Sequence, residues 1–261
     1  TGAYLMQKTA YNNHYYLLVL ISAIMCFLPA NRAYSLDSRR NPQIRRDDMY
    51  ALVKWIIVAQ LLIVYSYAAI AKLYTDWLDF SIIAQLMDSR SDYYLIGPLL
   101  QLPCVHTLVG VFGILFDFSV VPLLLYRPTR KWAFAASVFF HLFNSLVFQI
   151  GIFPYLSLAF TVFFYEPETI RRIFFKKKPV PGPGTVSRPR HAPIRLVGLG
   201  IYFLIQLVLP IRHHFIQGDV LWTEEGHRMS WRMMLRSRSG HLKFRVVDKE
   251  TGATEWIRLG D

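Results

Sequence analysis

Residues 50–74 read YALVKWIIVAQLLIVYSYAAIAKLY, a long apolar run whose only charges are Lys54 near its start and Lys72 near its end. A helix that crosses a lipid bilayer needs about 20 consecutive, mostly apolar residues. The stretch therefore predicts a membrane-spanning α-helix with a lysine close to each end.

The composition of the whole chain agrees with a membrane protein. Of the 261 residues, 54% are hydrophobic and 18% are charged, whereas soluble domains average about 45–50% and about 25%. This balance argues against a soluble enzyme and against a disordered regulator. The formal net charge is +12, but the basic residues cluster between apolar runs, so we expect no nucleic-acid partner.

Similar apolar runs lie on both sides of residues 50–74. Further spans are predicted at residues 15–30, 103–126, 131–149, 155–165 and 194–212. Residues 78–100 are amphipathic and are broken at Gly97, which indicates an interfacial or re-entrant helix. The predicted fold class is an α-helical integral membrane bundle of about five or six spans plus an interfacial helix.

Three basic stretches predict the orientation, because Lys and Arg are retained on the cytoplasmic side of membranes. They are SRRNPQIRR (38–46), RPTRK (127–131) and RRIFFKKK (171–178). The acidic segment TDWLD (75–79) and the end of the chain are then extracytoplasmic. Residues 179–190, PVPGPGTVSRPR, predict a flexible cytoplasmic linker.

The composition changes abruptly after residue 212. Apolar and polar residues alternate in HLKFRVV (241–247), DKETG (248–252) offers a turn, and TEWIRL follows, a pattern typical of a β-hairpin. We therefore divide the chain into a transmembrane domain, 1–212, and a small extracytoplasmic β-containing segment, 213–261.

The chain begins at Thr1 rather than at a methionine, and we expect its N-terminus to have been trimmed.

Ionisable residues inside apolar helices are functional candidates, because a charge at mid-bilayer costs roughly 2.5–3.5 kcal/mol. Lys72 has two interpretations. In the first, its side chain reaches the interface or pairs with Asp76. In the second, it is a desolvated amine, whose neutral form could remove a proton from a hydroquinone. Asp117 lies within another span, and we expect it to pair with an Arg or Lys of a neighbouring helix.

Two histidines lie in the predicted spans. His14 follows Asn12 and Asn13 at the outer end of the first span, where helix capping is one explanation. His141 lies in the middle of 131–149, and Asn144, one turn later, continues a polar stripe on the same helix face. Such a stripe faces either a cavity or another helix. No metal site is predicted, since the remaining histidines lack the spacing of a known metal cluster.

Six segments, in order along the chain, resemble the vitamin K-dependent gamma-glutamyl carboxylase and the broader horizontally transferred transmembrane (HTTM) domain family. They are NNHYYL (12–17), YAAIAKLYTDW (67–77), GILFDFS (113–119), HLFNSLVFQIGIFPYLSLA (141–159), LPIRHHFIQG (209–218) and SWRMMLRSRS (230–239). They occur in one order and are distributed over nearly the whole chain, which makes the resemblance specific.

The resemblance implies a membrane enzyme that oxidises reduced vitamin K, a phylloquinone or menaquinone hydroquinone, with O2. In the family a lysine deprotonates the hydroquinone, and the strong base formed with oxygen removes a proton from a peptide glutamate. CO2 then adds to the glutamate, and the quinone leaves as its epoxide. The implied partners are membrane lipid, the quinol and a glutamate-containing peptide or protein.

The resemblance also implies roles for particular residues. The family's lysine falls on Lys72, and its histidines fall on His14, His141 and His213, so these four are the expected catalytic residues. We expect His14 and His141 also to bind the quinone, together with Asn13 and Asn144. In the predicted topology Lys72, His14 and His213 converge on the extracytoplasmic side, with His141 deeper in an apolar cavity of ligand size.

The chain departs from the family at three positions: Ala71 replaces the first of two lysines, His227 replaces a tyrosine, and Arg236 replaces a histidine. The large lumenal domain that binds a substrate is also expected to be absent, because about 49 residues follow Arg212. Epoxidation is therefore a safer prediction than carboxylation. The alternative is a non-catalytic quinone- or lipid-binding membrane protein.

Overall fold

The computed structural model describes residues 11–46, 49–174, 192–233 and 243–258. The chain is mostly helical, with one two-stranded sheet. Its elements are α2 (Asn13–Phe27), α3 (Leu36–Arg40), η2 (Pro42–Ile44), α4 (Ala51–Ala71), α5 (Thr75–Leu78), α6 (Ser81–Asp88), α7 (Gly97–Leu100), α8 (Pro103–Leu125), α9 (Arg130–Val147), α10 (Phe153–Phe160), η3 (Thr161–Phe164), α11 (Pro167–Phe174), α12 (Ala192–Val208), η4 (Leu209–Phe215), α13 (Val220–Thr223), β1 (Lys243–Val247) and β2 (Thr254–Arg258).

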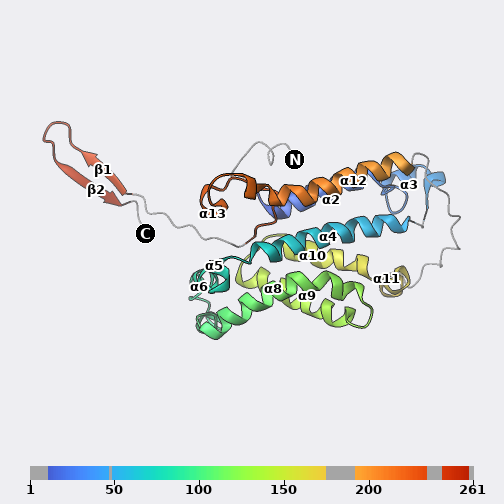
Figure 1. The fold of residues 1–261 in the computed structure, drawn as a ribbon, viewed down its shortest axis with the longest axis horizontal. Helices are drawn as coiled ribbons and strands as arrows, with labels where there is room; N and C mark the ends of the chain where they lie inside the picture. The colour runs from blue at the N-terminus through green and yellow to red at the C-terminus, as the bar shows by residue number, and fades with distance from the viewer. Residues whose placement is uncertain (1–10, 47–48, 175–191, 234–242, 259–261) are drawn as a thin grey trace.

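Helix α4 is the central helix of the bundle (Figure 1). It packs against α8 along one side and touches η3 and α12 on others, while α9 packs between α8 and α10. In its most apolar part 61% of α4 is buried, compared with 39% for α8 and 11% for Pro193–Phe215. The span predicted at residues 50–74 is therefore the helix around which the others assemble.

Three helices of the described chain are long and apolar enough to cross a membrane: Ala51–Ala71, Pro103–Leu125 and Pro193–Phe215. Asn13–Phe27 and Phe153–Phe164 are apolar but shorter. The predicted span at 131–149 forms α9, which is outside this set because charged and polar side chains interrupt its apolar surface. Three of the about five or six predicted spans are therefore long apolar helices in the described chain, and the total number of spans stays a prediction.

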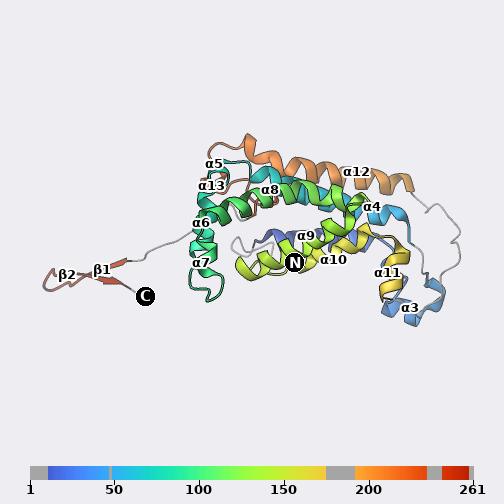
Figure 2. The ribbon, with the colours of Figure 1, turned by 90° about the horizontal axis from the view of Figure 1, so that it is seen from below.

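Residues 75–102 form short helices instead of a crossing one, as predicted for an interfacial piece. α5, α6 and α7 gather at one end of the bundle (Figures 1 and 2). The left-handed backbone of Phe80, φ 65°, lies between α5 and α6 and allows the chain to turn sharply there.

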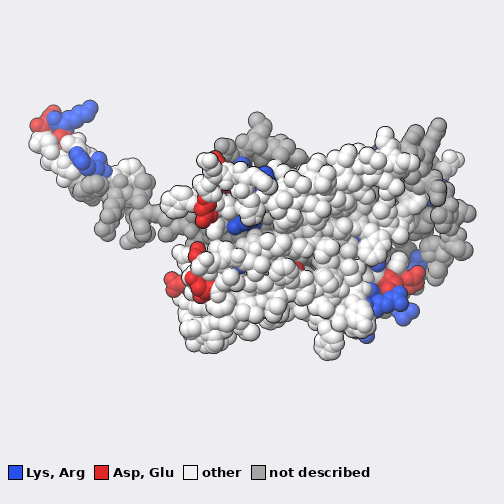
Figure 3. Space-filling view, viewed as in Figure 1, with Lys and Arg blue, Asp and Glu red and all other residues white. Residues whose placement is uncertain are grey.

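On the face that Figure 3 shows, charged side chains gather at the two ends of the bundle and the middle is nearly free of them. α3 and α11, which carry two of the predicted cytoplasmic basic stretches, lie at the same end in both ribbon views (Figures 1 and 2). The third stretch joins them, because Arg127 and Arg130 both pair with Glu166 next to α11. An uncharged belt between charged ends is the pattern of an integral membrane protein.

Polar side chains also join the helices within the belt. Tyr202 of α12 donates to the Oε1 atom of Gln60, 2.6 Å away, and Gln60 is fully buried in α4. Gln206 of α12 donates to the Tyr16 hydroxyl of α2, at 3.0 Å. Such bonds hold helices together where lipid replaces water as the surrounding solvent.

The predicted hairpin is present. β1 and β2 pair antiparallel with Lys243 opposite Arg258 and Val247 opposite Thr254, and Gly252 supplies the positive φ, 69°, that the connecting turn needs. Residues 209–233 are helical turns packed on the bundle, and Trp231 is fully buried in its core. The predicted linker, 179–190, lies outside the described residues, and the division of the chain at residue 212 stays a prediction.

We expect Gly110→Ala to destabilise the bundle. A methyl group at Gly110 would lie 2.5 Å from a ring carbon of Phe80 and 2.7 Å from Ile83, and overpacking of this kind costs about 1–3 kcal/mol. The measurement is the thermal unfolding midpoint of the purified chain in detergent. Gly113→Ala on the same helix is the control, because there the methyl would meet only Trp77, at 3.5 Å. Equal midpoints for the two variants would refute the close packing at Gly110.

Candidate active site

Lys72 lies at the C-terminal end of α4, where the helix ends. Its backbone N–H bonds to the Ala69 carbonyl at 3.0 Å, and its side chain turns back along the helix, so that Nζ is 3.4 Å from the Ala68 carbonyl. Only 7% of the residue is exposed. Lys72 therefore does not reach the interface, which was one interpretation of the sequence.

Asp117 of α8 is the partner of Lys72. Its Oδ2 atom forms an ion pair with Nζ, and only 5% of Asp117 is exposed. The expectation that Asp117 pairs with a basic residue of a neighbouring helix is confirmed, whereas the pairing of Lys72 with Asp76 is wrong. Asp76 is exposed beyond the end of α4, while α8 runs along α4 and brings Asp117 beside the amine.

Trp77 covers this ion pair. The Lys72 amine lies 5.2 Å from the centre of the indole ring, close enough for a cation–π attraction. The indole N–H donates to the Gly110 carbonyl at 3.2 Å, and the ring edge lies over Gly113. Sequence reasoning missed this role of Trp77, although two glycines one turn apart on α8 indicate a close approach of another group.

His141 lies in a second buried cluster. Its Nε2 atom is 2.9 Å from the Tyr65 hydroxyl of α4. The ring of Phe116, the residue before Asp117, stands edge-on to both His141 and Tyr65, with centroids 5.8 and 6.1 Å away. The Phe116–Asp117 pair of α8 therefore joins the two clusters.

His14 approaches His141 from the other side. The His14 ring stacks on Phe153, with centroids 5.0 Å apart, and Phe153 stands edge-on to His141 at 6.0 Å. Phe153 thus separates two of the predicted site histidines. Within the described chain, the buried Nδ1 atom of His141 has no hydrogen-bond partner.

Asn13 is engaged in structural hydrogen bonds. Its Nδ2 atom donates to the Arg232 carbonyl at 2.9 Å, and its Oδ1 atom accepts from the Tyr11 hydroxyl at 2.6 Å. The same hydroxyl accepts from the Met229 N–H, also at 2.6 Å. Asn13 therefore ties residues 229–232 to the start of α2. Asn12 caps α2 by accepting from the His14 N–H at 2.8 Å, as the capping interpretation expects.

His213 belongs to this third group of residues. Its Nε2 atom is 3.3 Å from an Arg232 nitrogen, and its Nδ1 atom is 2.8 Å from the Pro210 carbonyl. Tyr74, two residues after Lys72, is near enough to Arg232 for the positive charge of the arginine to act on its phenol group. Burial, aided by the negative charge of Asp76, raises the pKa of Tyr74 to about 12 in spite of Arg232. Tyr74 is therefore a neutral phenol at physiological pH.

The polar side chains of α9 have different surroundings at the two ends of the stripe. His141 is buried, Asn144 is half-buried, and Ser145 bonds the Tyr155 hydroxyl of α10 at 2.9 Å. Gln149 donates to the Tyr93 hydroxyl at 3.0 Å. The far end of the stripe thus serves helix association, and only the His141 end lies in the buried cluster.

The structure accordingly pairs Lys72 with Asp117, places Phe153 between His141 and His14, and connects His213 and Asn13 through Arg232. None of these residues lines the two hollows at the other end of α4, which are lined by residues such as Arg32 and Arg46. Among the described residues, no group of three His, Cys, Asp or Glu side chains could hold a metal ion.

Two family models match the chain. The HTTM domain model matches residues 1–168, and the model for the lumenal domain of vitamin K-dependent gamma-carboxylase matches residues 191–261. The expectation that the large lumenal domain is absent, which counted only the residues after Arg212, is corrected in part, because lumenal-domain sequence is recognised from residue 191 and includes α12. No solved structure matches the chain.

We expect Asn13→Leu to loosen residues 229–233. The substitution removes the hydrogen bonds that Asn13 makes with the Arg232 carbonyl and the Tyr11 hydroxyl, and loss of the partner of a buried polar group costs about 1–3 kcal/mol. Hydrogen exchange of residues 229–233 should be faster than in the unaltered protein. Asn144→Leu is the matched control, because it makes the same change in another apolar helix. Equal exchange in both variants would show that Asn13 does not anchor the segment.

Proposed function

Because the chain belongs to the HTTM domain family, we propose that it is a gamma-carboxylase-like membrane enzyme. The proposed reaction is oxygen-dependent epoxidation of a reduced naphthoquinone, coupled to carboxylation of glutamate in a peptide. The lumenal-domain match supports the peptide substrate. When bound, the reduced naphthoquinone would supply, with O2, the strong base that glutamate carboxylation by CO2 requires.

The observation that carries this proposal is the buried pair of Lys72 and Asp117. Burial opposes an isolated charge, but the pair is neutral overall both as ammonium with carboxylate and as amine with carboxylic acid. In the second arrangement Lys72 has a free electron pair in an apolar surrounding. It can take a proton from a weakly acidic hydroxyl of the quinol. The deprotonated quinol then carries the negative charge that balances the new ammonium, and the carbonyl oxygen of the neutral Asp117 side chain accepts a hydrogen bond from that ammonium.

The cluster around His141 fits a quinone ring. Phe116, Phe140 and Phe153 stand within 4.0–6.0 Å of a neighbouring ring of the cluster, and aromatic faces suit a flat apolar ligand. If the Tyr65 hydroxyl donates to Nε2, the ring proton of His141 lies on Nδ1, the atom without a partner. His141 would then donate a hydrogen bond to a ring oxygen, with His14 behind Phe153 and Asn144 one turn away.

Asn13 and His213 take positioning roles in this proposal. Asn13 anchors the segment that contains Arg232, and His213 lies against the same arginine. The two residues would therefore shape the extracytoplasmic entrance to the site, where a glutamate carboxylate could approach a cation.

A non-catalytic quinone-binding membrane protein is the second candidate function. The aromatic surround of His141 would bind a quinone even if Lys72 removed no proton. Epoxide formation distinguishes the two functions, because binding alone consumes no oxygen.

We predict that loss of the Lys72 amine lowers quinol epoxidation at least about 100-fold, the usual size of a general-base effect. Lys72→Ala alone leaves Asp117 buried and uncompensated, which destabilises by about 3–5 kcal/mol. The test therefore includes the double variant Lys72→Ala/Asp117→Leu, in which both charges are removed. Epoxide is measured with reduced vitamin K under O2.

Lys54→Ala is the control, since it removes a lysine near the other end of the same helix. It should leave epoxide formation unchanged, and small added amines should restore some activity to Lys72→Ala. A folded double variant with unaltered epoxidation would eliminate Lys72 as the base.

We predict that Tyr65→Phe weakens quinone binding about 3- to 10-fold, the value of one neutral hydrogen bond. The variant loses the hydroxyl that orients the His141 ring. Binding is titrated with oxidised quinone, so that no turnover is required. Tyr67→Phe is the control, because the Tyr67 hydroxyl bonds the Leu207 carbonyl instead. The role of His141 is wrong if both variants bind as tightly as the unaltered protein.

A further inference from the structure

An apolar groove lies between α2, α4 and α12, at the end of α4 opposite to Lys72. Its volume is about 1320 Å³, larger than the roughly 300–1,000 Å³ of usual small-molecule sites. Its apolar walls include Ile24, Phe27, Val53, Ile56, Leu196 and Leu199. The groove therefore has room for long hydrocarbon chains.

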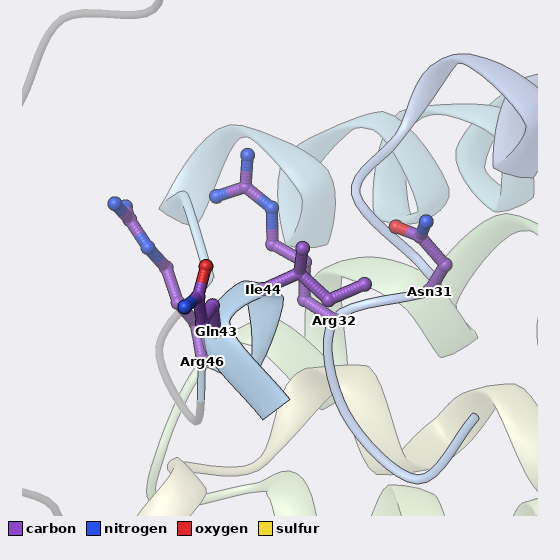
Figure 4. Close-up of a pocket in the computed structure, with 5 residues that line it drawn as sticks. All are labelled: Asn31, Arg32, Gln43, Ile44 and Arg46. Atoms are coloured by element: carbon purple, nitrogen blue, oxygen red, sulfur yellow. The ribbon is translucent and has the colours of Figure 1, made fainter. Parts of the chain in front are cut away.

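A smaller polar hollow of about 310 Å³ adjoins this groove. The two share Asn31, Arg32 and Arg46 as lining residues. Figure 4 shows the side chains of Arg32 and Arg46 extending in the same direction, on either side of Gln43. The chain is held in this shape by a backbone bond from the Arg46 N–H to the Arg32 carbonyl, at 3.1 Å.

Three arginine side chains line the groove. Arg195 of α12 lines the groove together with Arg32 and Arg46. The ion pairs of the described residues involve Lys72, Arg127 and Arg130, so no described carboxylate lies within ion-pair distance of these three guanidinium groups. Asp37 accepts a hydrogen bond from the Asn31 amide, at 3.2 Å.

We propose that the groove and the hollow together bind one anionic diacyl phospholipid. The acyl chains lie in the apolar groove, and the phosphate lies on Arg32 and Arg46, whose planar guanidinium groups suit phosphate oxygens. Basic pockets between membrane helices on the cytoplasmic side attract anionic head groups, and this is the end that carries the basic stretches of the chain.

The bound lipid would stabilise the attachment of α12, the least buried of the three long helices. Tyr202 lines the groove and also donates to Gln60 of α4. Acyl chains in the groove would shield this hydrogen bond from competing polar groups. The lipid would therefore fill the space between α2, α4 and α12 and stabilise the packing of these three helices.

The test of the head-group site is native mass spectrometry of the full chain in detergent, titrated with phosphatidylglycerol or with phosphatidylcholine of the same acyl chains. One phosphatidylglycerol should bind in preference to phosphatidylcholine, and Arg32→Gln/Arg46→Gln should weaken it about tenfold. Arg39→Gln/Arg40→Gln is the matched control, because it removes two exposed arginines from the same end. Equal binding of the two lipids, or equal loss in both variants, would overturn the proposal.

The test of the acyl-chain site uses two glycines of α12. A side chain added at Gly198, which lines the groove, meets no atom within 4 Å, and the same is true of Gly200, which is not among the lining residues. Gly198→Leu should fill the groove and abolish the increase of the unfolding midpoint caused by phosphatidylglycerol, whereas Gly200→Leu should keep it. If Gly198→Leu keeps the full increase, the acyl chains are not in this groove.

Discussion

The burial of an amine beside a carboxylate, Lys72 with Asp117, is the constraint on which the bundle depends. Two opposite charges can stay in an apolar interior only if they remain in contact. The end of α4 must therefore lie against the middle of α8, and Trp77 must fold over Gly110 and Gly113 to exclude lipid and water. The same contact places Phe116 between Tyr65 and His141, so one ion pair arranges both buried clusters.

The sequence predicts those elements whose residues follow a strong period. The long apolar run at 50–74 predicts α4, because a helix must be about that long to cross a bilayer. Alternating apolar and polar residues predict the two strands, because successive side chains of a strand point to opposite faces. The partner of Asp117 was predictable in kind, since only a basic residue can satisfy it. Lys72 itself could not be chosen from the sequence, because Asp76, four positions away, offered an equally good local pairing.

Contacts that depend on how helices pack were not predictable. Helices in membranes are apolar on all sides, and such a pattern does not say which face meets which neighbour. Phe153 between His14 and His141, Trp77 over Lys72, and the bond from Asn13 to the carbonyl of Arg232 all arise in this way. The last joins residues 219 positions apart. Nothing in the sequence therefore indicated that Asn13, expected to bind the cofactor, also bonds a segment near the other end of the chain.

The most direct test of the proposed enzyme is an isotope measurement on the unaltered chain in lipid nanodiscs. Reduced vitamin K is supplied under ¹⁸O2, and the quinone products are analysed by mass spectrometry. The account predicts an epoxide that carries one ¹⁸O atom and forms only when both quinol and oxygen are present. Recovery of quinone without labelled epoxide, from protein shown to be folded and to bind quinone, would contradict it.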